Sequence, residues 1–442
     1  MSRRTRYAVV GLGGRSHMYT RAIVRDFADR AELVGLCDLN QTRMDYWNRV
    51  FAEEYNAAPV PTFGAERFDE MIRQQKVDCV VVTTIDRTHH QYIIRAMELG
   101  CDAITEKPMT VDAPRCQAIL DTIARTGRRL TVTFNYRYAP RNSRVKQLLM
   151  DNAIGQVLSV HFEWLLDTVH GADYFRRWHR DKRNGGGLMV HKATHHFDLV
   201  NWWLNSRPVK VFGLGRLAFY GRENAEQRGQ TRFYDRAHNH PAAREDPFAL
   251  HMAEDPRLRG LYLDAEHEDG YIRDQSVFGH NISIEDDMAV LVQYASGASL
   301  SYHLTAYSPW EGFRIAFNGT RGRLEYDVEE RSYISAQAAN PHQPPAIDPS
   351  LQPEEIHEPA RILLRPHWGR PMRVELPTAS EGGHGGGDRR LLEDIFADRQ
   401  PDPLGRAADH VDGAWSILTG IAANLSFASG MPVETAPLVR FP

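Results

Sequence analysis

The chain has 442 residues, of which 42% are hydrophobic and 25% are charged, as in an ordinary globular protein. This length predicts two or three domains and excludes a fibre, a disordered tail and a disulfide-stapled miniprotein. Acidic side chains number 57 and basic side chains 53, so the formal net charge of −4 provides no broad positive field for a nucleic acid or an anionic membrane. We expect neither as a partner.

Location and cysteine chemistry can also be predicted. No stretch approaches the about 20 apolar residues that span a bilayer, and the short apolar run after the basic N-terminus does not resemble a signal peptide. We therefore expect a cytoplasmic protein. The cysteines form no C-x-x-C pair, so we expect buried thiols without a redox or zinc role at Cys37, Cys79, Cys101 and Cys116.

The first 110 residues alternate between strand and helix patterns. Residues 7–10 form an apolar run that leads into glycines and then into an amphipathic stretch over residues 18–28. A second run covers residues 33–37, and a β-branched run over residues 78–83 is followed by a helical pattern over residues 92–99. This order predicts an α/β fold with a parallel, doubly wound sheet.

The turn after the first strand has the pattern G-x-G-x-x-S. Gly11 permits a tight turn, and Gly13 lets a pyrophosphate approach the backbone where the next helix presents free N–H groups. Alone, the motif also fits a plain structural turn. Asp38, which ends the second run, can accept the ribose hydroxyls of NAD and would repel the 2′-phosphate of NADP. The sequence therefore predicts NAD as the cofactor, bound by Gly11, Gly13, Gly14, Arg15, Ser16 and Asp38.

A more specific pattern follows at residues 83–108. The sequence Thr83-Thr84, then His89, Gly100 and Glu106-Lys107-Pro108 resembles the glucose-fructose oxidoreductase, inositol dehydrogenase and MocA (Gfo/Idh/MocA) family. The likeness covers most of residues 5–205 and 280–330. It includes Asn135-Tyr136-Arg137-Tyr138 and residues 154–157, 186–198, 285–287 and 318–322.

The resemblance implies two domains. A Rossmann domain over residues 1–130 would bind NAD, and an α/β domain over residues 131–442 would bind substrate with a large, mostly antiparallel sheet. Alternating patterns at residues 289–294 and 298–304 agree with strands of that sheet. Because this sheet often forms an oligomer interface in the family, we expect a homo-oligomer, either a dimer or a tetramer.

Two stretches depart from a compact domain of this family. Residues 215–280 are rich in His, Asp, Arg and Pro and are predicted to be an insertion. Residues 336–371 are rich in proline and are predicted to be a surface loop.

Removing hydride from an alcohol requires a base for the hydroxyl proton. The family places the lysine of E-K-P and an aspartate and a histidine of the glycine-rich helix around that hydroxyl, which here correspond to Lys107, His191 and His195. Only the aspartate position departs, since His191 cannot hold a fixed negative charge. The resemblance also implies cofactor contacts for Thr83, His89, Glu106 and Lys107.

We expect residues 189–203 to form one helix, on which His191 and His195 share a face at positions i and i+4. A metal held by this pair is an alternative, but the H-E-x-x-H pattern is missing and we expect none. His196 and Asp198 are expected to cap the helix or line the core.

Substrate contacts are predicted from aromatic and cationic side chains, which stack on sugar rings and bind their hydroxyl or acidic groups. Residues 383–388 resemble the H-G-G-x-D string of NAD-dependent α-N-acetylgalactosaminidases in the same superfamily. A helix is expected to start at Arg389 with Asp388 as its cap. The predicted substrate-binding residues are Tyr136, Arg137, Arg177, Trp178, Lys192 and His384.

The segment before and within the glycine-rich helix also carries an excess of positive charge. The cations Arg176, Arg177, Arg180, Lys182, Arg183 and Lys192 face only two acidic residues of this segment, Asp173 and Asp181. This excess predicts a sugar or glycoside with an anionic substituent.

Four functions remain open. The leading hypothesis is NAD-dependent oxidation of a sugar or glycoside to a keto-sugar. The alternative is an NAD-dependent glycosidase that oxidises the ring transiently, eliminates the aglycone, adds water and restores the hydride. The insertion, His191 and His384 favour this alternative. A non-catalytic NAD sensor is opposed by Lys107 and His195, and a metal-dependent lyase or hydrolase would need His191 and His195 with His238 and His240.

Overall fold

The computed structural model describes residues 3–334, 360–376, 383–398 and 400–441, without the side chains of residues 383–385. Its first sheet has six parallel strands in the order β3-β2-β1-β4-β5-β6. They are β1 (Thr5–Val10), β2 (Ala31–Asp38), β3 (Thr62–Gly64), β4 (Cys79–Val82), β5 (Asp102–Thr105) and β6 (Leu130–Val132). The predicted doubly wound sheet is confirmed, with its switch point between β1 and β4.

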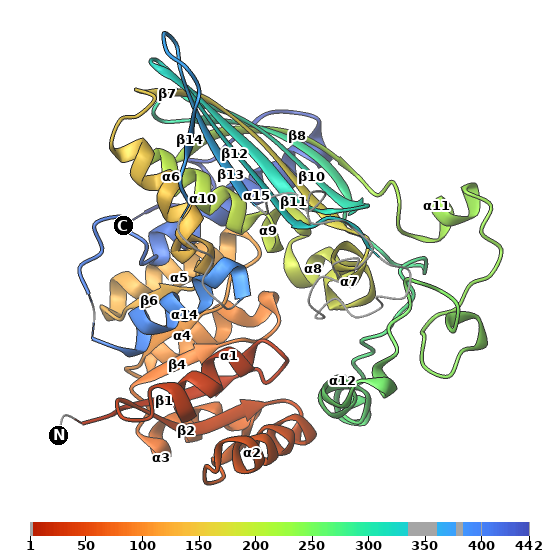
Figure 1. Cartoon of the computed structure of the whole chain (residues 1–442). Helices are drawn as coiled ribbons and strands as arrows, with labels where there is room; N and C mark the ends of the chain where they lie inside the picture. The colour runs from red at the N-terminus through yellow and green to blue at the C-terminus, as the bar shows by residue number, and fades with distance from the viewer. Residues whose placement is uncertain (1–2, 335–359, 377–382, 399, 442) are drawn as a thin grey trace.

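Helices cover both faces of this sheet (Figure 1). The predicted helix over residues 18–28 is α1 (Ser16–Arg21) followed by a π-helical turn (Ala22–Asp26), and the one over residues 92–99 is α4 (His89–Glu98). The other helices are α2 (Gln41–Tyr55), α3 (Phe68–Gln75) and α5 (Ala113–Thr126). All four cysteines are buried free thiols, as predicted.

The second sheet has nine strands in the order β14-β13-β12-β11-β7-β10-β9-β8-β15. Among the described strand pairs of this sheet only β10 and β7 are parallel, so the predicted mostly antiparallel sheet is confirmed. Its strands are β7 (Val157–Asp167), β8 (Pro208–Arg216), β9 (Asp287–Tyr294), β10 (Ser299–Ser308), β11 (Glu311–Gly319), β12 (Gly322–Arg331), β13 (Ala360–Pro366), β14 (Met372–Val374) and β15 (Val433–Glu434).

The predicted loop over residues 336–371 is partly wrong. Residues 335–359 lie outside the described chain, but Ala360–Pro366 form β13, which pairs with β12. Ile362 is fully buried in this strand, so burial of its apolar side chain outweighs the turn-forming composition around it.

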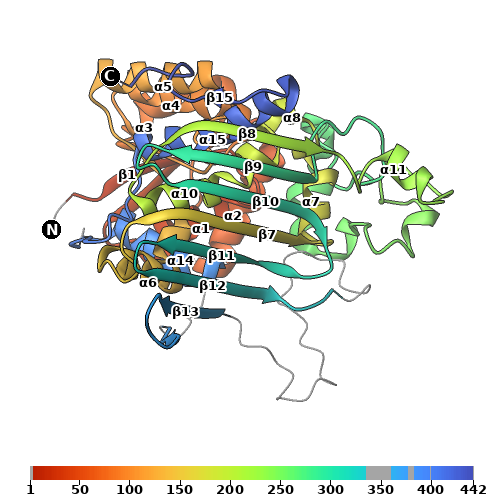
Figure 2. The ribbon, with the colours of Figure 1, turned by 90° about the horizontal axis from the view of Figure 1, so that it is seen from above.

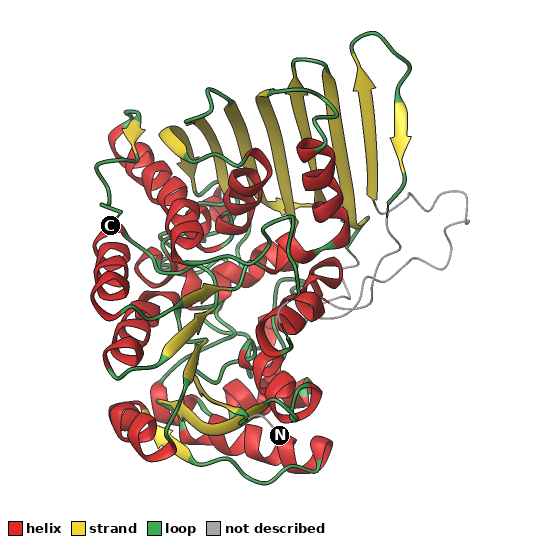
Figure 3. Ribbon diagram, turned by 90° about the vertical axis from the view of Figure 1, so that its left-hand side faces the viewer, coloured by secondary structure: helices red, strands yellow, loops and turns green. Residues whose placement is uncertain are grey.

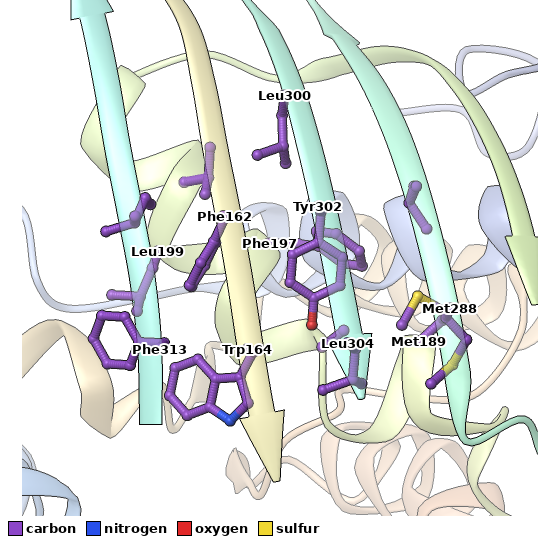
Figure 4. Packing of buried hydrophobic residues seen from close by; sticks show 14 of the residues in the cluster. Phe162, Trp164, Met189, Phe197, Leu199, Met288, Leu300, Tyr302, Leu304 and Phe313 are labelled. Carbon is purple, nitrogen blue, oxygen red and sulfur yellow. The ribbon is translucent and has the colours of Figure 1, made fainter. Parts of the chain in front are cut away.

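One face of the large sheet packs on helices α6 (Pro140–Met150), α10 (Thr194–Leu204) and α15 (His410–Ser429). Figure 4 shows Phe162 and Trp164 of β7 and Tyr302 of the neighbouring β10 on the same face of the sheet, with Phe197 of α10 next to Tyr302. No helix covers the opposite face in Figure 2. The two faces match the alternation of buried and exposed residues along β9.

The predicted single helix over residues 189–203 is wrong. Helix α9 (Leu188–His191) ends at a turn over residues 192–193, and α10 starts at Thr194. The His195 N–H donates to Lys192 O (3.3 Å) instead of to His191 O, which accepts from Lys107 Nζ (3.1 Å). The break therefore turns His191 away from the helix face of His195.

Residues 217–286 join the neighbouring strands β8 and β9 and contain the predicted insertion. They hold helix α11 (Arg222–Gln227), α12 (Pro256–Leu258), a π-helical turn (Arg259–Leu263) and α13 (Glu266–Asp269). The part from α12 to α13 reaches down to helix α2 of the first sheet (Figures 1 and 3). None of the helices in the described ranges is long and apolar enough to cross a membrane.

Candidate active site

The glycine turn after β1 is held in a fixed shape by its neighbours. Gly11 has a φ of +86°, and a Cβ atom there would lie 2.5 Å from the backbone N of Thr84, so only glycine fits. Thr83 Oγ1 donates to Gly11 O (2.5 Å), and Ser16 Oγ donates to Gly13 O (2.8 Å). The turn therefore keeps the open backbone that a pyrophosphate requires.

Asp38 lies beside this turn at the end of β2, where the sequence predicts a contact with ribose. Its carboxylate is 8% exposed and accepts from the N–H groups of Leu12 (2.5 Å) and Asn40 (2.9 Å). The residues present fit a bound dinucleotide, because the glycine turn and an oriented carboxylate stand side by side.

The insertion contacts the same turn, which no sequence pattern indicated. Gly14 N–H donates to the Tyr262 hydroxyl (2.9 Å), and the Arg257 guanidinium donates to Gly14 O (3.0 Å). Arg43 on α2 forms an ion pair with Asp269 (2.6 Å). These contacts join segments more than 200 residues apart, so only the fold reveals them.

Glu106 connects the glycine turn with Lys107. Its Oε1 accepts from Arg15 Nε (2.5 Å) and from the Tyr19 hydroxyl (2.7 Å), and its Oε2 accepts from Lys107 N (3.1 Å). Burial opposes ionisation of Glu106, but the charges of Arg15 and Lys107 lower its pKa. A fixed carboxylate thus accepts from the backbone N–H of Lys107, and its charge acts on the Lys107 amine.

The Lys107 amine points into the second domain, where its Nζ donates to His191 O (3.1 Å). Burial lowers its pKa to about 8, although Glu106 and Asp86 act in the opposite direction. His191 Nδ1 lies 2.5 Å from Asp86 Oδ2. Burial raises the pKa of Asp86 and lowers that of His191, which favours a neutral pair in which the carboxyl group holds the proton.

Asp86 was missed by the sequence analysis, although it lies between Thr84 and His89 of the family-like pattern. Its carboxylate stands beside the histidine that replaces the family's aspartate. The carboxyl group absent from position 191 is therefore supplied by the segment that follows β4. The signal in the sequence was an acidic residue in the short segment that follows a buried parallel strand.

His179 faces this pair and was also not singled out. It is 2% exposed, its ring centroid lies 4.1 Å from that of His191, and it stacks on Trp178 at 3.5 Å. Neither ring nitrogen has a hydrogen-bond partner within the described part of the chain. The predicted residue Trp178 thus holds a second buried imidazole against His191.

His195, also predicted to be catalytic, has its ring edge-on against Tyr136 (centroids 4.9 Å apart) and near Phe134, and its catalytic role stays a prediction. His196 stacks on Trp164, and its Nδ1 lies 2.6 Å from the Tyr302 hydroxyl, so it lines the core as expected. The helix breaks at residues 192–193, so His191 and His195 do not stand at positions i and i+4 of one helix. The metal alternative therefore loses the spacing on which it depended.

Several predicted site residues have other roles. Arg137 is buried in an ion pair with Asp198 and Asp412, so the structure contradicts a substrate contact by its guanidinium. His89 is 1% exposed, and its ring nitrogens lie 2.8 Å from Pro108 O and 3.0 Å from Thr84 O, so it fixes two loops rather than facing the cofactor.

The predicted helix start at Arg389 is also wrong. Helix α14 (Gly383–Phe396) begins six residues earlier and includes the glycines. Asp388 is not its cap and instead accepts from Asn135 Nδ2 (2.5 Å). His384 lies in the first turn of α14, and its side chain is outside the described residues.

Most of the six cations counted in the sequence are paired within the protein. Lys182 pairs with Glu285, and Arg183 pairs with Asp181. Arg180 donates to Ser276 O and His280 O, and Lys192 is buried with its Nζ 5.0 Å from the Trp164 ring centroid. The count therefore overstates the charge available to a substrate, and Arg176 and Arg177 share one carboxylate, that of Asp173.

Both halves of the chain match domain models of one known protein family. Residues 5–134 match the NAD-binding Rossmann fold of an oxidoreductase family, and residues 146–435 match the C-terminal alpha/beta domain of the same family. YteT of Bacillus subtilis, named as an oxidoreductase, is 35% identical over 447 residues and is covered to 97%, as is this chain.

More distant relatives share parts of the sequence or the fold. A glycosyl hydrolase family 109 protein of Akkermansia muciniphila is 26% identical over 199 residues, which are 42% of this chain and 40% of that protein. The crystal structure of an aldose-aldose oxidoreductase from Caulobacter crescentus has the same fold, with a TM-score of 0.61 at 19% identity over 98% of this chain and 100% of that one.

Proposed function

The chain belongs to the Gfo/Idh/MocA oxidoreductase family, and we propose that it removes hydride from a ring carbon of a sugar or glycoside, with net oxidation to a keto-sugar. Its first domain is an NAD-binding Rossmann domain, as the sequence predicted. The observation that carries the proposal is the position of Lys107, between the glycine turn and the His191–Asp86 pair.

Each group has a role in this proposal. The glycine turn and Asp38 hold NAD, with contributions from Arg15, Ser16 and Thr83, and bound NAD supplies the hydride acceptor. Lys107 takes the hydroxyl proton, because an amine with a pKa of about 8 is partly neutral at physiological pH. His191 and Asp86 then hold or pass on the proton.

A second candidate is glycoside hydrolysis with transient ring oxidation. Elimination of an aglycone requires further acid and base groups near the oxidised ring. His179, buried against His191 and without a partner among the described residues, is a group that a simple dehydrogenase does not need. The likeness to a glycosyl hydrolase family 109 protein supports the same candidate.

The two reactions can be separated by one screen. Free sugars and 4-nitrophenyl glycosides are incubated with protein and NAD, and both NADH absorbance and phenol release are followed. Accumulating NADH with a keto-sugar supports the dehydrogenase, whereas phenol release without net NADH supports the glycosidase. Neither signal with any carbohydrate contradicts the proposal.

Lys107→Ala tests the role of the amine. The variant should bind NAD but transfer hydride roughly 10² to 10⁴ times more slowly in a single turnover, the range expected for loss of a general base. Lys210→Ala is a matched control, since Lys210 pairs with Glu434 at the edge of the large sheet. Near wild-type hydride transfer by Lys107→Ala would rule out the catalytic role.

A further inference from the structure

Two buried arginines, Arg176 and Arg273, and the partly buried Arg177 surround a single carboxylate beside the proposed active site. Asp173 lies on α7 (His170–Arg176) and accepts from Arg273 with both oxygens (2.8 and 3.2 Å). Arg176 (3.3 Å) and Arg177 (3.1 Å) donate to the same carboxylate. One negative charge therefore faces three positive charges.

Other nearby acids do not balance this excess. Asp274, next to Arg273 in the chain, accepts from His238 N (2.7 Å) and pairs with Arg236 (2.8 Å). Asp86 lies in hydrogen-bond contact with His191, and burial raises its pKa, which favours the neutral carboxyl group. Burying positive charge without a counter-ion is costly, so the cluster is expected to serve a negative ligand.

The same cluster carries donors without partners. The Nε atoms of Arg177 and Arg273, the Tyr271 hydroxyl and both ring nitrogens of His179 are buried and have no hydrogen-bond partner within the described residues. Both terminal nitrogens of Arg273 donate to Asp173. Arg177 gives Asp173 one terminal nitrogen, and its side chain keeps 26% exposure.

These donors lie next to the reacting groups. The charge of Arg177 acts on Asp86, on His191 and on His179, which contacts the His191 ring. Tyr271 comes from the insertion, and its ring centroid lies 6.1 Å from that of Tyr262, which contacts the glycine turn. A ligand at Arg177 would therefore stand beside the site of hydride transfer.

We propose that Arg177, Tyr271 and His179 form a subsite for a carboxylate carried by the sugar, so that the substrates are hexuronic acids or their glycosides. A guanidinium can give a carboxylate two parallel N–H bonds, and the phenol and the imidazole can add further donors. A neutral hydroxymethyl group could accept hydrogen bonds but would leave the charge excess in place. The inference rests on the proposed function, because it assigns the ring substituent of that same substrate.

Calorimetric titration of the NAD-loaded protein tests the subsite. The probes are the α and β anomers of 4-nitrophenyl glucuronide and galacturonide, each paired with the neutral glucoside or galactoside. We expect at least one uronide to bind ~10-fold more tightly than its neutral partner, about 1.4 kcal/mol, and the ratio to fall as salt rises. Equal affinity for every pair overturns the proposal, and binding of sodium acetate alone as tightly as the uronide identifies a free-anion site instead.

Variants locate the effect. Arg177→Gln and Tyr271→Phe should each reduce the ratio of uronide to neutral affinity, whereas Arg183→Gln should leave it unchanged, because Arg183 is exposed and pairs with Asp181. Tyr271→Phe keeps the ring, so it remains informative if Arg177→Gln fails to fold. An unchanged ratio in both folded variants overturns the proposal, as does a loss of NAD affinity in place of uronide affinity, which would assign the cluster to the cofactor phosphates.

The failure of this inference can be told apart from failure of the proposed function. Uronide binding that depends on Arg177, without NADH or phenol formation from any probe, contradicts the proposed chemistry and supports the subsite. Oxidation of neutral sugars with no uronide preference supports the proposed chemistry and contradicts the subsite.

Discussion

Lys107 gains its chemistry from its position between two domains. Burial lowers its pKa to about 8, and the charge of Lys192 acts in the same direction. Glu106 and Asp86 limit the shift. An amine in this setting is protonated enough to bind a hydroxyl oxygen and neutral enough to remove its proton.

The rate of hydride transfer should therefore depend on pH. The neutral amine is the base, and its fraction rises as pH passes upward through about 8, so the rate should increase tenfold per pH unit below that value and level off above it. Single-turnover NADH formation from about pH 6 to about pH 10 measures this profile. In Lys107→Ala the rising limb should be missing, and a flat profile in the wild type would contradict the assignment.

Asp38 should set the choice of cofactor. Backbone N–H groups of Leu12 and Asn40 hold its carboxylate beside the glycine turn, where it can accept ribose hydroxyls and repel a 2′-phosphate. Glu268 of the insertion places a second carboxylate at the start of α2, accepting from Gln41 N (2.5 Å) and Thr42 N (2.8 Å). The helix end that could attract an extra phosphate is thus already filled by negative charge.

We expect NAD to bind at least ~10-fold more tightly than NADP, about 1.4 kcal/mol. Fluorescence titration with both cofactors measures the ratio. Asp38→Asn should reduce the ratio of NAD to NADP affinity by weakening the repulsion of the 2′-phosphate. Asp151→Asn, a change directly after α6, should leave the ratio unchanged. Equal affinities in the wild type would exclude Asp38 as the selecting residue.

At the level of elements, the sequence predicted strands better than helix ends. The runs over residues 33–37 and 78–83 are apolar, and the second is also rich in β-branched residues. Such short apolar runs are typical of strands that are buried between two layers of helices. The break at residues 192–193 has no such signal. There the Lys107 amine donates to His191 O, which would accept from the His195 N–H in an unbroken helix, and Lys107 lies 84 residues before His191 in the chain.

The active site also contains residues that local motifs predict and residues whose roles depend on contacts between distant segments. The family pattern located Lys107 and His191, which belong to short motifs with fixed spacing. Asp86, His179, Arg273 and Tyr271 carry no motif, and each acquires its role only where separate segments meet. Arg137 looked like a substrate ligand because its buried partner Asp198 is 61 residues away in the chain.

Helix α14 illustrates how a tertiary contact changes the meaning of glycine. A glycine string favours a flexible loop, but a Cβ atom at Gly387 would lie 2.3 Å from Asn135 O, so glycine here permits close packing of α14 on the segment before α6. Gly387→Ala should destabilise the fold by about 1 to 3 kcal/mol through this overlap. Urea unfolding measures the loss, and Arg389→Ala, an exposed position of the same helix, should change stability by less than about 0.5 kcal/mol. Equal stability of the two variants would show that the contact is not tight.

At the level of the whole molecule, the two sheets are joined by a shared helix. Residues Ala414, Ile417, Leu418 and Ile421 of α15 pack in one cluster with Val132 of β6, while Ala422 and Ala423 belong to the core under the large sheet. The backbone of α9 also touches α15, where a Cβ atom at Gly420 would lie 2.2 Å from Met189 O. Helix α15 thus fixes the distance between the NAD-binding turn and the helix that carries His191.

The uncovered face of the large sheet should form a dimer interface (Figure 2). Leu214 of β8 and Leu291 of β9 are 66% and 57% exposed there, an unusual position for large apolar side chains in a monomer. The other half of this face carries both signs of charge, with Arg314 and Arg323 beside Glu163 and Glu325. A second copy related by a two-fold axis can cover the apolar half of this face with its own apolar half and can pair opposite charges, because a two-fold contact uses the same surface twice.

Sedimentation should therefore detect a dimer, and Leu214→Glu with Leu291→Glu should dissociate it by burying like charges against each other. Met150→Glu changes an equally exposed apolar residue at the end of α6, on the covered side of the sheet, and should leave the dimer intact. A monomeric wild type, or a double variant that stays dimeric, would exclude this face as the interface.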